Sequence, residues 1–143
     1  MSATADHAET NLVVRLGFQP DQIVQEIGYD DDADQELREA IEAATGTKLA
    51  NEDHDDPADA VVLWFREDDG DLTDALVDAI ASMEEGGTIL LLTPKTGRDG
   101  YIEPSEISEA STTAGLAQTK TINAGKGWNG SRLITPKGAA KLR

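Results

Sequence analysis

Residues 59–95 carry the pattern that most constrains how this chain can fold. Residues 60–65 (Ala-Val-Val-Leu-Trp-Phe) and 88–93 (Thr-Ile-Leu-Leu-Leu-Thr) are almost continuous apolar runs, which are typical of strands covered on both faces. Between them, apolar residues recur at helical spacing at Leu72, Leu76, Ile80 and Met83. Asp71 is placed to cap this helix, and Gly86 and Gly87 are placed to end it. The order strand, helix, strand predicts a parallel βαβ unit.

The segment before this unit predicts a further strand and helix. Residues 22–27 are the expected first strand, which Gly28 ends. Residues 34–45 are the expected helix, and their apolar residues repeat with helical periodicity. The acidic residues at the start of this helix complement its dipole, and Gly46 is placed to cap its end.

The segment after the central unit predicts a helix and an antiparallel hairpin. Pro104 opens a helix that runs to about residue 114. Residues 120–124 and 131–135 are expected strands, joined by the turn-forming residues 125–130. We therefore expect an α/β fold: a mainly parallel twisted sheet with flanking helices and an antiparallel hairpin at its carboxyl-terminal edge.

The chain length is that of one domain. We expect residues 1–10 to be a disordered tail, residues 11–136 to be a single α/β domain that starts with a helical turn, and residues 137–143 to be a loose basic tail. The first ten residues have neither a basic start nor an apolar stretch, so they predict no signal peptide. No apolar run reaches the ~20 residues that span a bilayer, and cysteine is absent. A cytoplasmic protein is expected.

Charge divides the chain into two unequal parts. The formal net charge is -16, and residues 1–87 hold 24 of the 28 acidic residues but 4 of the 12 basic ones. Such a surface repels phosphates, which argues against nucleic-acid binding. The acidity fits a solvated face, a docking surface for a basic protein partner, or weak cation binding. The candidate partner surface consists of Asp30, Asp31, Asp32, Asp34, Glu36 and Glu39.

Ligands of open parallel sheets bind outside the carboxyl ends of the strands. The loops expected there begin at Gly28, Arg66 and Pro94. The candidate ligand cleft consists of Tyr29, Arg66, Lys95, Arg98 and Trp128. Each of these residues also has an ordinary structural explanation, such as a solvated lysine after a strand, whereas Trp64 on the central strand is expected in the core.

The sequence lacks the motifs of common cofactor and metal sites. The dinucleotide fingerprint needs three glycines after the first strand, but here Gly28 is followed by four aspartates within residues 30–34, which oppose phosphate. An EF-hand loop starting at Asp30 would need glycine at its sixth position and glutamate at its twelfth, where Gln35 and Ile41 stand. His54 has no nucleophile near it in sequence. We predict no cofactor, no metal and no catalytic residues.

Several segments resemble a known family. They are residues 15–20 (Arg-Leu-Gly-Phe-Gln-Pro), 59–66 (Asp-Ala-Val-Val-Leu-Trp-Phe-Arg), 91–100 (Leu-Leu-Thr-Pro-Lys-Thr-Gly-Arg-Asp-Gly), 115–116 (Gly-Leu) and 127–132 (Gly-Trp-Asn-Gly-Ser-Arg). This pattern resembles the uncharacterised actinobacterial domain-of-unknown-function family 3052 over residues 12–137. The resemblance implies no established activity and transfers no catalytic residue.

Residues 59–135 also have the order of elements of a second, larger group. Strand, helix, Gly-Gly, strand, helix and antiparallel hairpin are similar to the later half of S-adenosylmethionine-dependent methyltransferases, which implies a truncated Rossmann-like fold. The glycine-rich cofactor loop of that group is replaced here by Asp30 to Asp34. The likeness therefore favours the fold and disfavours the function.

From these observations we expect a non-catalytic cytoplasmic regulatory or adaptor protein that binds another protein through its acidic amino-terminal part. The alternative is a small-ligand-binding protein or enzyme that uses the cleft at the strand ends.

Overall fold

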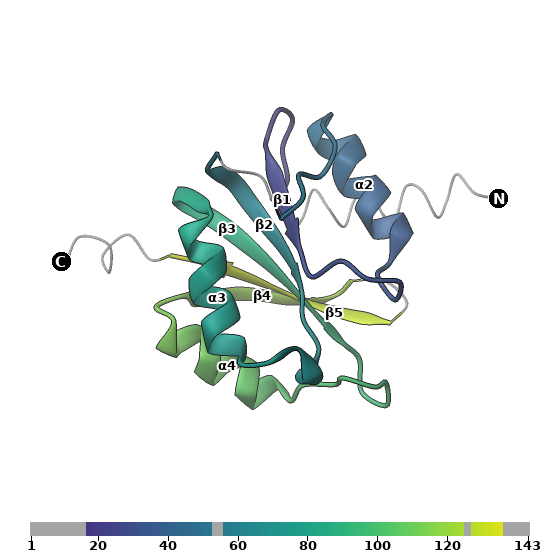
Figure 1. The fold of residues 1–143 in the computed structure, drawn as a ribbon, viewed down its shortest axis with the longest axis vertical. Coiled ribbons are helices and arrows are strands. Elements are labelled where there is room, and N and C mark those ends of the chain that lie inside the picture. The colour runs from purple at the N-terminus through teal and green to yellow at the C-terminus, as the bar shows by residue number, and fades with distance from the viewer. Residues whose placement is uncertain (1–16, 53–55, 125–126, 136–143) are drawn as a thin grey trace.

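The computed structural model describes residues 17–52, 56–124 and 127–135. They form one five-stranded sheet, flanked by helices (Figure 1). The elements in chain order are β1 (Val24–Ile27), α2 (Gln35–Thr45), β2 (Ala58–Trp64), the short 3-10 helix η1 (Glu67–Asp69), α3 (Leu72–Ala81), β3 (Met83–Pro94), α4 (Pro104–Thr113), β4 (Ala117–Asn123) and β5 (Trp128–Ile134). The tails predicted at residues 1–10 and 137–143 and the helical turn predicted at residues 11–16 lie outside the described residues.

The strand order is β1-β2-β3-β5-β4. The pairs β1–β2 and β2–β3 are parallel, whereas β5 runs antiparallel to both β3 and β4. Four of the five strands therefore point the same way, and β5 alone is reversed. This arrangement confirms the predicted α/β fold with a mainly parallel sheet and a carboxyl-terminal hairpin.

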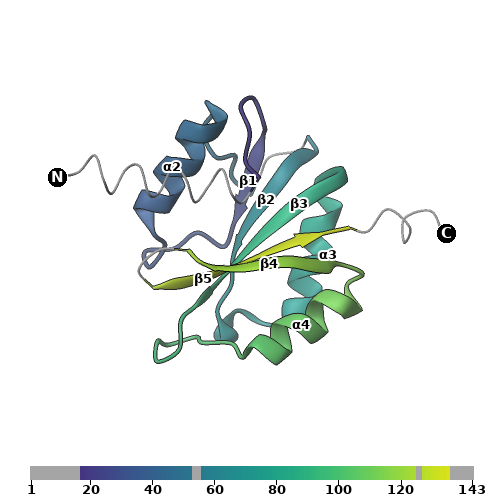
Figure 2. The ribbon, with the colours of Figure 1, turned by 180° about the vertical axis from the view of Figure 1, so that it is seen from behind.

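Helices cover both faces of the sheet. The inward side chains of α2 join Val62 and Trp64 of β2 in one buried cluster. On the other face, α3 and α4 pack against Val61, Leu63 and Phe65. The helices α3 and α4 lie side by side on this face in both views (Figures 1 and 2). Because β2 and β3 are covered twice, their sequences are almost continuously apolar.

Local signals set the helix limits. The Asp34 side chain accepts a hydrogen bond from the Leu37 backbone N–H at 3.1 Å and so caps the start of α2. Gly46 ends this helix with φ +78° and donates its N–H to Glu42. Asp71 caps α3 in the same way as Asp34 caps α2, as predicted. Pro104 occupies the first turn of α4.

The predicted end of α3 is wrong. The helix ends at Ala81, and Met83 already pairs with Ala58 as the start of β3. Gly86, with φ +83°, and Gly87 therefore lie inside the β3 element and not at a helix end. A Cβ at Gly87 would lie 3.1 Å from the backbone oxygen of Asp59. The glycine pair thus lets the irregular start of β3 approach β2 closely.

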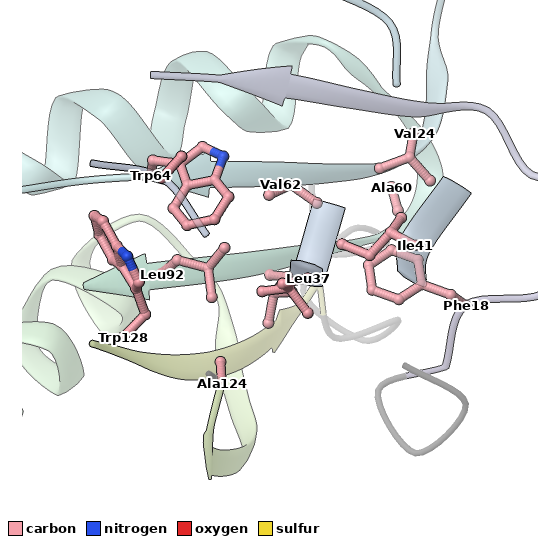
Figure 3. Close-up of a cluster of buried hydrophobic side chains, with 12 residues drawn as sticks. Phe18, Val24, Leu37, Ile41, Ala60, Val62, Trp64, Leu92, Ala124 and Trp128 are labelled. Atoms are coloured by element: carbon pink, nitrogen blue, oxygen red, sulfur yellow. The ribbon is translucent and has the colours of Figure 1, made fainter. Parts of the chain in front are cut away.

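The turn of the carboxyl-terminal hairpin is also shorter than predicted. Residues 128–130, which we expected in the turn, are the first residues of β5, and Trp128 pairs with Pro94. This pairing turns the Trp128 side chain into the buried cluster beneath α2 (Figure 3).

Leu63 tests the assignment of the central strand. Its side chain is buried between the sheet and the helices α3 and α4, so Leu63→Ala should lower the free energy of unfolding by about 2–5 kcal/mol. Urea unfolding measures this loss. The control is Val77→Ala on α3: Val77 is 49% exposed, so the change should stay within about 0.5 kcal/mol. A Leu63→Ala loss as small as that of the control would contradict two-sided burial of β2.

Candidate functional site at the carboxyl ends of the strands

Four loops meet at one edge of the sheet. They follow β1, β2 and β3, whose carboxyl ends coincide because the strands are parallel, and the fourth is the turn between β4 and β5. Next to β3 the strand direction changes, because β5 pairs with β3 in the antiparallel sense. Such edges are where α/β proteins usually hold their ligands, so this is the candidate functional site.

Arg66 fastens the loop after β1 to the end of β2. Its Nη1 donates to the Gly28 carbonyl oxygen at 2.7 Å, and its Nε donates to Asp32 Oδ2 at 3.1 Å. Its Nη2 forms an ion pair with the other oxygen of the same Asp32 carboxylate. Its Nη1 forms an ion pair with Asp69 Oδ2, at an N–O distance of 3.3 Å. The guanidinium therefore binds four groups of the protein itself, since Nη1 also donates to the Trp64 carbonyl oxygen at 3.4 Å, and the Arg66 side chain is largely buried.

These contacts change the pKa values of both partners. The hydrogen bond from Arg66 holds the pKa of Asp32 below its ordinary value, against the opposing effect of partial burial. Burial alone would lower the pKa of Arg66, but its hydrogen bonds to Asp32 and Asp69 raise it. Both groups are therefore held in their charged forms near neutral pH.

Trp128 lies beneath this ion pair. Its Nε1 donates to the Asp32 carbonyl oxygen at 3.1 Å. Its ring meets Trp64 edge to face, with 4.8 Å between centroids and an interplanar angle of 78° (Figure 3). The guanidinium carbons of Arg66 and Arg98 lie 5.3 and 5.6 Å from its centroid. Trp128 is 1% exposed, so the prediction that it supplies aromatic surface to an open cleft is wrong.

The other cleft residues take different places. Tyr29 is 48% exposed; its hydroxyl accepts from Gln35 at 2.8 Å, and the Arg38 guanidinium lies 4.2 Å from its ring centroid. Arg98 donates to the Gly127 carbonyl oxygen at 2.7 Å. The backbone N–H of Lys95 donates to the same oxygen at 3.0 Å. Arg66, Arg98 and Trp128 therefore form one cluster, and Tyr29 belongs to the start of α2.

Glu26 is a buried carboxylate at this edge that the sequence analysis missed. It accepts hydrogen bonds from Trp64 Nε1 at 2.8 Å and from Arg38 Nε and Nη2 at 2.6 and 2.8 Å. The hydrogen bonds to Glu26 raise the pKa of Arg38, and this effect outweighs partial burial, which alone would lower that pKa. The available signal was an acid between the apolar residues Val24 and Ile27, together with Arg38 as the single basic residue of α2.

The six predicted partner-surface carboxylates divide into two groups. Asp32 is ion-paired with Arg66, and the Asp34 side chain caps α2, so both carboxylates already have partners within the protein. The other four are exposed, and no ion pair is found for them within the described ranges: they are Asp30, Asp31, Glu36 and Glu39.

Two further features can be stated for the part of the chain that the structure describes. It contains no group of three or more Asp, Glu or His side chains placed to hold a metal ion, and His54 lies outside it. None of its helices is both long and apolar enough to cross a bilayer.

The sequence matches known proteins along nearly its whole length. A family model described as "Protein of unknown function (DUF3052)" matches residues 13–137. Two uncharacterized proteins, from Mycobacterium tuberculosis and Mycobacterium bovis, are each 50% identical over 139 residues, which covers 97% of this chain and 87% of each relative. The resemblance predicted from the sequence motifs is confirmed.

The fold matches solved methyltransferase structures. The pyocyanin biosynthetic protein PhzM superposes with a TM-score of 0.66 at 11% identity, over 94% of this chain and 56% of PhzM. A SAM-dependent methyltransferase from Aquifex aeolicus superposes with a TM-score of 0.56 at 12% identity, over 90% of this chain and 89% of that protein. The chain thus spans little more than half the length of PhzM. At such identities the likeness shows a shared Rossmann-like α/β fold.

The Asp32–Arg66 ion pair predicts a pH dependence of stability. Because the folded-state pKa of Asp32 is lowered, the pair stabilises the fold above the ordinary aspartate pKa of about 4, and this stabilisation disappears as the pH falls through the folded value. Asp32→Asn should therefore cost about 1 kcal/mol at pH 7, a figure reduced for solvent screening, and progressively less as the pH falls below about 4. Urea unfolding at several pH values measures the difference. Asp31→Asn is the control, and an equal loss in both variants would contradict the assignment.

Glu26 should matter more for stability than any exposed acid of this region. Glu26→Ala leaves the Arg38 charge and the Trp64 N–H without their acceptor, so the free energy of unfolding should fall by about 3 kcal/mol. The tryptophan fluorescence spectrum should shift as well. Glu39→Ala is the control, because Glu39 is exposed on α2. It should change the free energy of unfolding by no more than about 0.5 kcal/mol and leave the fluorescence spectrum almost unchanged. A silent Glu26→Ala would show that the buried network is absent in solution.

Proposed function

The chain belongs to the family described as Protein of unknown function (DUF3052), and we propose that it is a non-catalytic cytoplasmic regulatory or adaptor protein that binds a basic protein partner. The observation that carries the proposal is the set of exposed, unpaired carboxylates at the start of α2, beside a strand-end site that the protein fills with its own side chains.

The use of Gly28 speaks against a cofactor at the strand ends. Gly28 has φ +82°, and a Cβ there would lie 2.3 Å from the Trp64 carbonyl oxygen. The glycine therefore serves the close approach of the loop to β2. The aspartates that follow it turn one carboxylate, Asp32, onto Arg66. Arg66 is thereby taken up by internal partners at the point where a phosphate or carboxylate of a ligand would need a cation.

The exposed carboxylates suit a positively charged partner. Asp30, Asp31, Glu36 and Glu39 lie within ten residues of one another, on the loop and the first turns of α2. Arg38, the single base of this helix, points its charge inward to Glu26. The surface therefore keeps a net negative field, which accelerates encounter with a basic protein and disfavours acidic competitors.

Calorimetry tests the non-catalytic half of the proposal. With Asp30–Asp34 in place of a glycine-rich loop, titration with S-adenosylmethionine or a dinucleotide should give no measurable binding below millimolar concentration. Micromolar affinity for either ligand would move the alternative ahead: a small-ligand binder or enzyme using Tyr29, Arg66, Lys95 and Arg98.

Charge reversal tests the partner surface. A partner captured from native lysate and identified by mass spectrometry would be measured by surface plasmon resonance. Glu36→Lys with Glu39→Lys should slow association about tenfold at low salt, because it removes the negative field that attracts a basic partner. The association rate of this variant should also depend less on salt, since salt acts by screening that field, to ~8 Å at physiological ionic strength. Both side chains lie off the buried stripe of Leu37 and Ile41, so the fold should persist.

Two controls accompany this experiment. Asp56→Lys with Glu84→Lys makes the same change in net charge near the amino ends of β2 and β3, and should have a much smaller effect. Lys95→Ala tests the strand-end cleft in place of Trp128, whose truncation would damage the core. If Lys95→Ala abolishes binding while the α2 reversals leave the rate unchanged, the acidic surface is not the docking site.

A further inference from the structure

The edge of the sheet at the strand ends holds an anion that the protein supplies itself. Both oxygens of the Asp32 carboxylate contact one Arg66 guanidinium: Oδ2 accepts from Nε at 3.1 Å, and Oδ1 pairs with Nη2. Arginine binds the carboxylate of a ligand in the same two-pronged geometry. The Asp32 side chain is 41% exposed, whereas that of Arg66 is 13% exposed. The carboxylate therefore lies on the solvent side of the pair, and the cation lies beneath it.

The orientation of Arg66 does not depend on Asp32 alone. Its Nη1 donates to the carbonyl oxygens of Gly28 and Trp64 at 2.7 and 3.4 Å and pairs with Asp69. Within the described residues, Nε and Nη2 have no acceptor besides the Asp32 carboxylate. Removal of this one carboxylate therefore leaves a guanidinium that is still held by Nη1, with two free donors on its solvent side.

A second arginine stands beside the first. The guanidinium carbons of Arg66 and Arg98 lie 5.3 and 5.6 Å from the centroid of the same Trp128 ring. The pKa of Asp32 is lowered chiefly by its hydrogen bond to Arg66, and the charge of Arg98 lowers it further. Arg98 is exposed, and in residues 17–52, 56–124 and 127–135 no carboxylate forms an ion pair with it. One anion at this place is therefore within reach of the fields of two guanidiniums.

The position of Arg98 is fixed by a glycine. Its Nη1 donates to the Gly127 carbonyl oxygen at 2.7 Å. A Cβ at Gly127 would lie 1.7 Å from this same nitrogen, so a larger residue would displace the guanidinium. The second cation of the site is therefore held in place before any ligand arrives, which reduces the entropy lost on binding.

We propose that Asp32 is an exchangeable internal ligand of a carboxylate site formed by Arg66 and Arg98, and that a carboxylate side chain of the partner protein replaces it. Four exposed acids lie on the two loops that meet at Arg66: Asp30, Asp31, Glu67 and Asp68. They repel the second charge of a phosphate monoester, so they favour a singly charged carboxylate. They also attract bases on either side of it. The ligand is therefore an aspartate or glutamate with lysine or arginine neighbours.

This inference has two parts, and only the second rests on the proposed function. The exchange needs Arg66, Arg98 and a free carboxylate. The assignment of that carboxylate to a basic partner names what the proposed partner presents to the strand ends. Trp128 is 1% exposed beneath the two arginines, so the site recognises the charged group and offers no surface to an aromatic ligand.

Chemical rescue tests the exchange. Asp32→Ala removes the internal carboxylate and keeps the backbone carbonyl oxygen that accepts from Trp128. Sodium formate should raise the urea midpoint of this variant above its value in sodium chloride of equal ionic strength, because a ligand that binds only the folded state stabilises it. The unaltered chain should show no difference between the salts, since its site is filled. Asp31→Ala, which removes an exposed acid of the same loop, is the matched control and should show none either.

Two results of this experiment would count against the site. Equal midpoints of Asp32→Ala in formate and chloride would overturn the exchange. A larger rescue by inorganic phosphate than by formate, at equal ionic strength, would overturn the assignment to a carboxylate.

Short peptides test the surroundings of the ligand carboxylate. The probes are end-capped Lys-Lys-Asp-Lys-Lys and the same peptide with asparagine at its centre, and binding is followed by the fluorescence of the two tryptophans of the chain. Asp32→Ala should bind the aspartate peptide at least tenfold more tightly than the asparagine peptide, because the carboxylate adds charge-assisted hydrogen bonds. The unaltered chain should bind the aspartate peptide more weakly than the variant does, since Asp32 competes. Equal affinity of the variant for both peptides would overturn the inference.

A second variant keeps the peptide test decisive if Asp32→Ala does not fold. Asp32→Asn keeps the side-chain size and loses the charge, so it should also bind the aspartate peptide more tightly than the unaltered chain does. No gain in affinity would again contradict the exchange.

The captured partner separates this inference from the proposed function. Asp32→Ala should raise its affinity, whereas the α2 reversals should slow its association. If the partner responds only to the α2 reversals, the adaptor function stands and the assignment of the carboxylate to that partner is wrong. If formate and the aspartate peptide bind as expected but neither change affects the partner, the carboxylate site stands and the proposed function fails.

Discussion

The arrangement of the strand ends depends on the Arg66 guanidinium. It binds the Gly28 carbonyl oxygen and the carboxylates of Asp32 and Asp69, so it joins the loop after β1 to the loop after β2. A largely buried cation needs such partners, because an unpaired charge in this position would be strongly unfavourable. The loop that carries Asp32 also lies over Trp128, whose indole N–H donates a hydrogen bond to the Asp32 carbonyl oxygen and whose ring packs on Trp64. One ion pair thus closes the edge of the sheet where other α/β proteins hold ligands.

A second buried charge supports the first from the side of α2. Glu26 accepts from both Trp64 and Arg38, so the indole that packs on Trp128 is itself fixed by a carboxylate. The two tryptophans connect the Glu26–Arg38 pair to the Asp32–Arg66 pair in one continuous network. Networks of this kind are stabilising only when every member finds its partner, so they hold their side chains in one arrangement.

The likeness to methyltransferases and the contents of this edge lead to different conclusions. The shared fold accounts for the strand order and the helix layers, but a fold carries function only through its site. Here Arg66 binds groups of the protein itself, and exposed carboxylates without an ion pair lie at the start of α2. This distribution supports the proposal that the protein binds partners with its surface.

The sequence by itself determined the features that depend on neighbouring residues. The apolar runs of β2 and β3 indicate burial on both faces, Asp34 and Asp71 cap helices three residues ahead, and Gly46 ends α2 in a conformation that favours glycine. Only the tertiary structure decided features whose partners are distant in the chain. Met83 continues the helical spacing of α3 yet pairs with Ala58 in the sheet. Asp32 differs from Asp31 because Arg66, 34 residues away in the chain, binds Asp32 and not Asp31. Glu26 can be buried because Arg38 and Trp64 donate hydrogen bonds to its carboxylate. No local pattern contains such pairings, since they arise when the strands align and bring separate loops to the same edge.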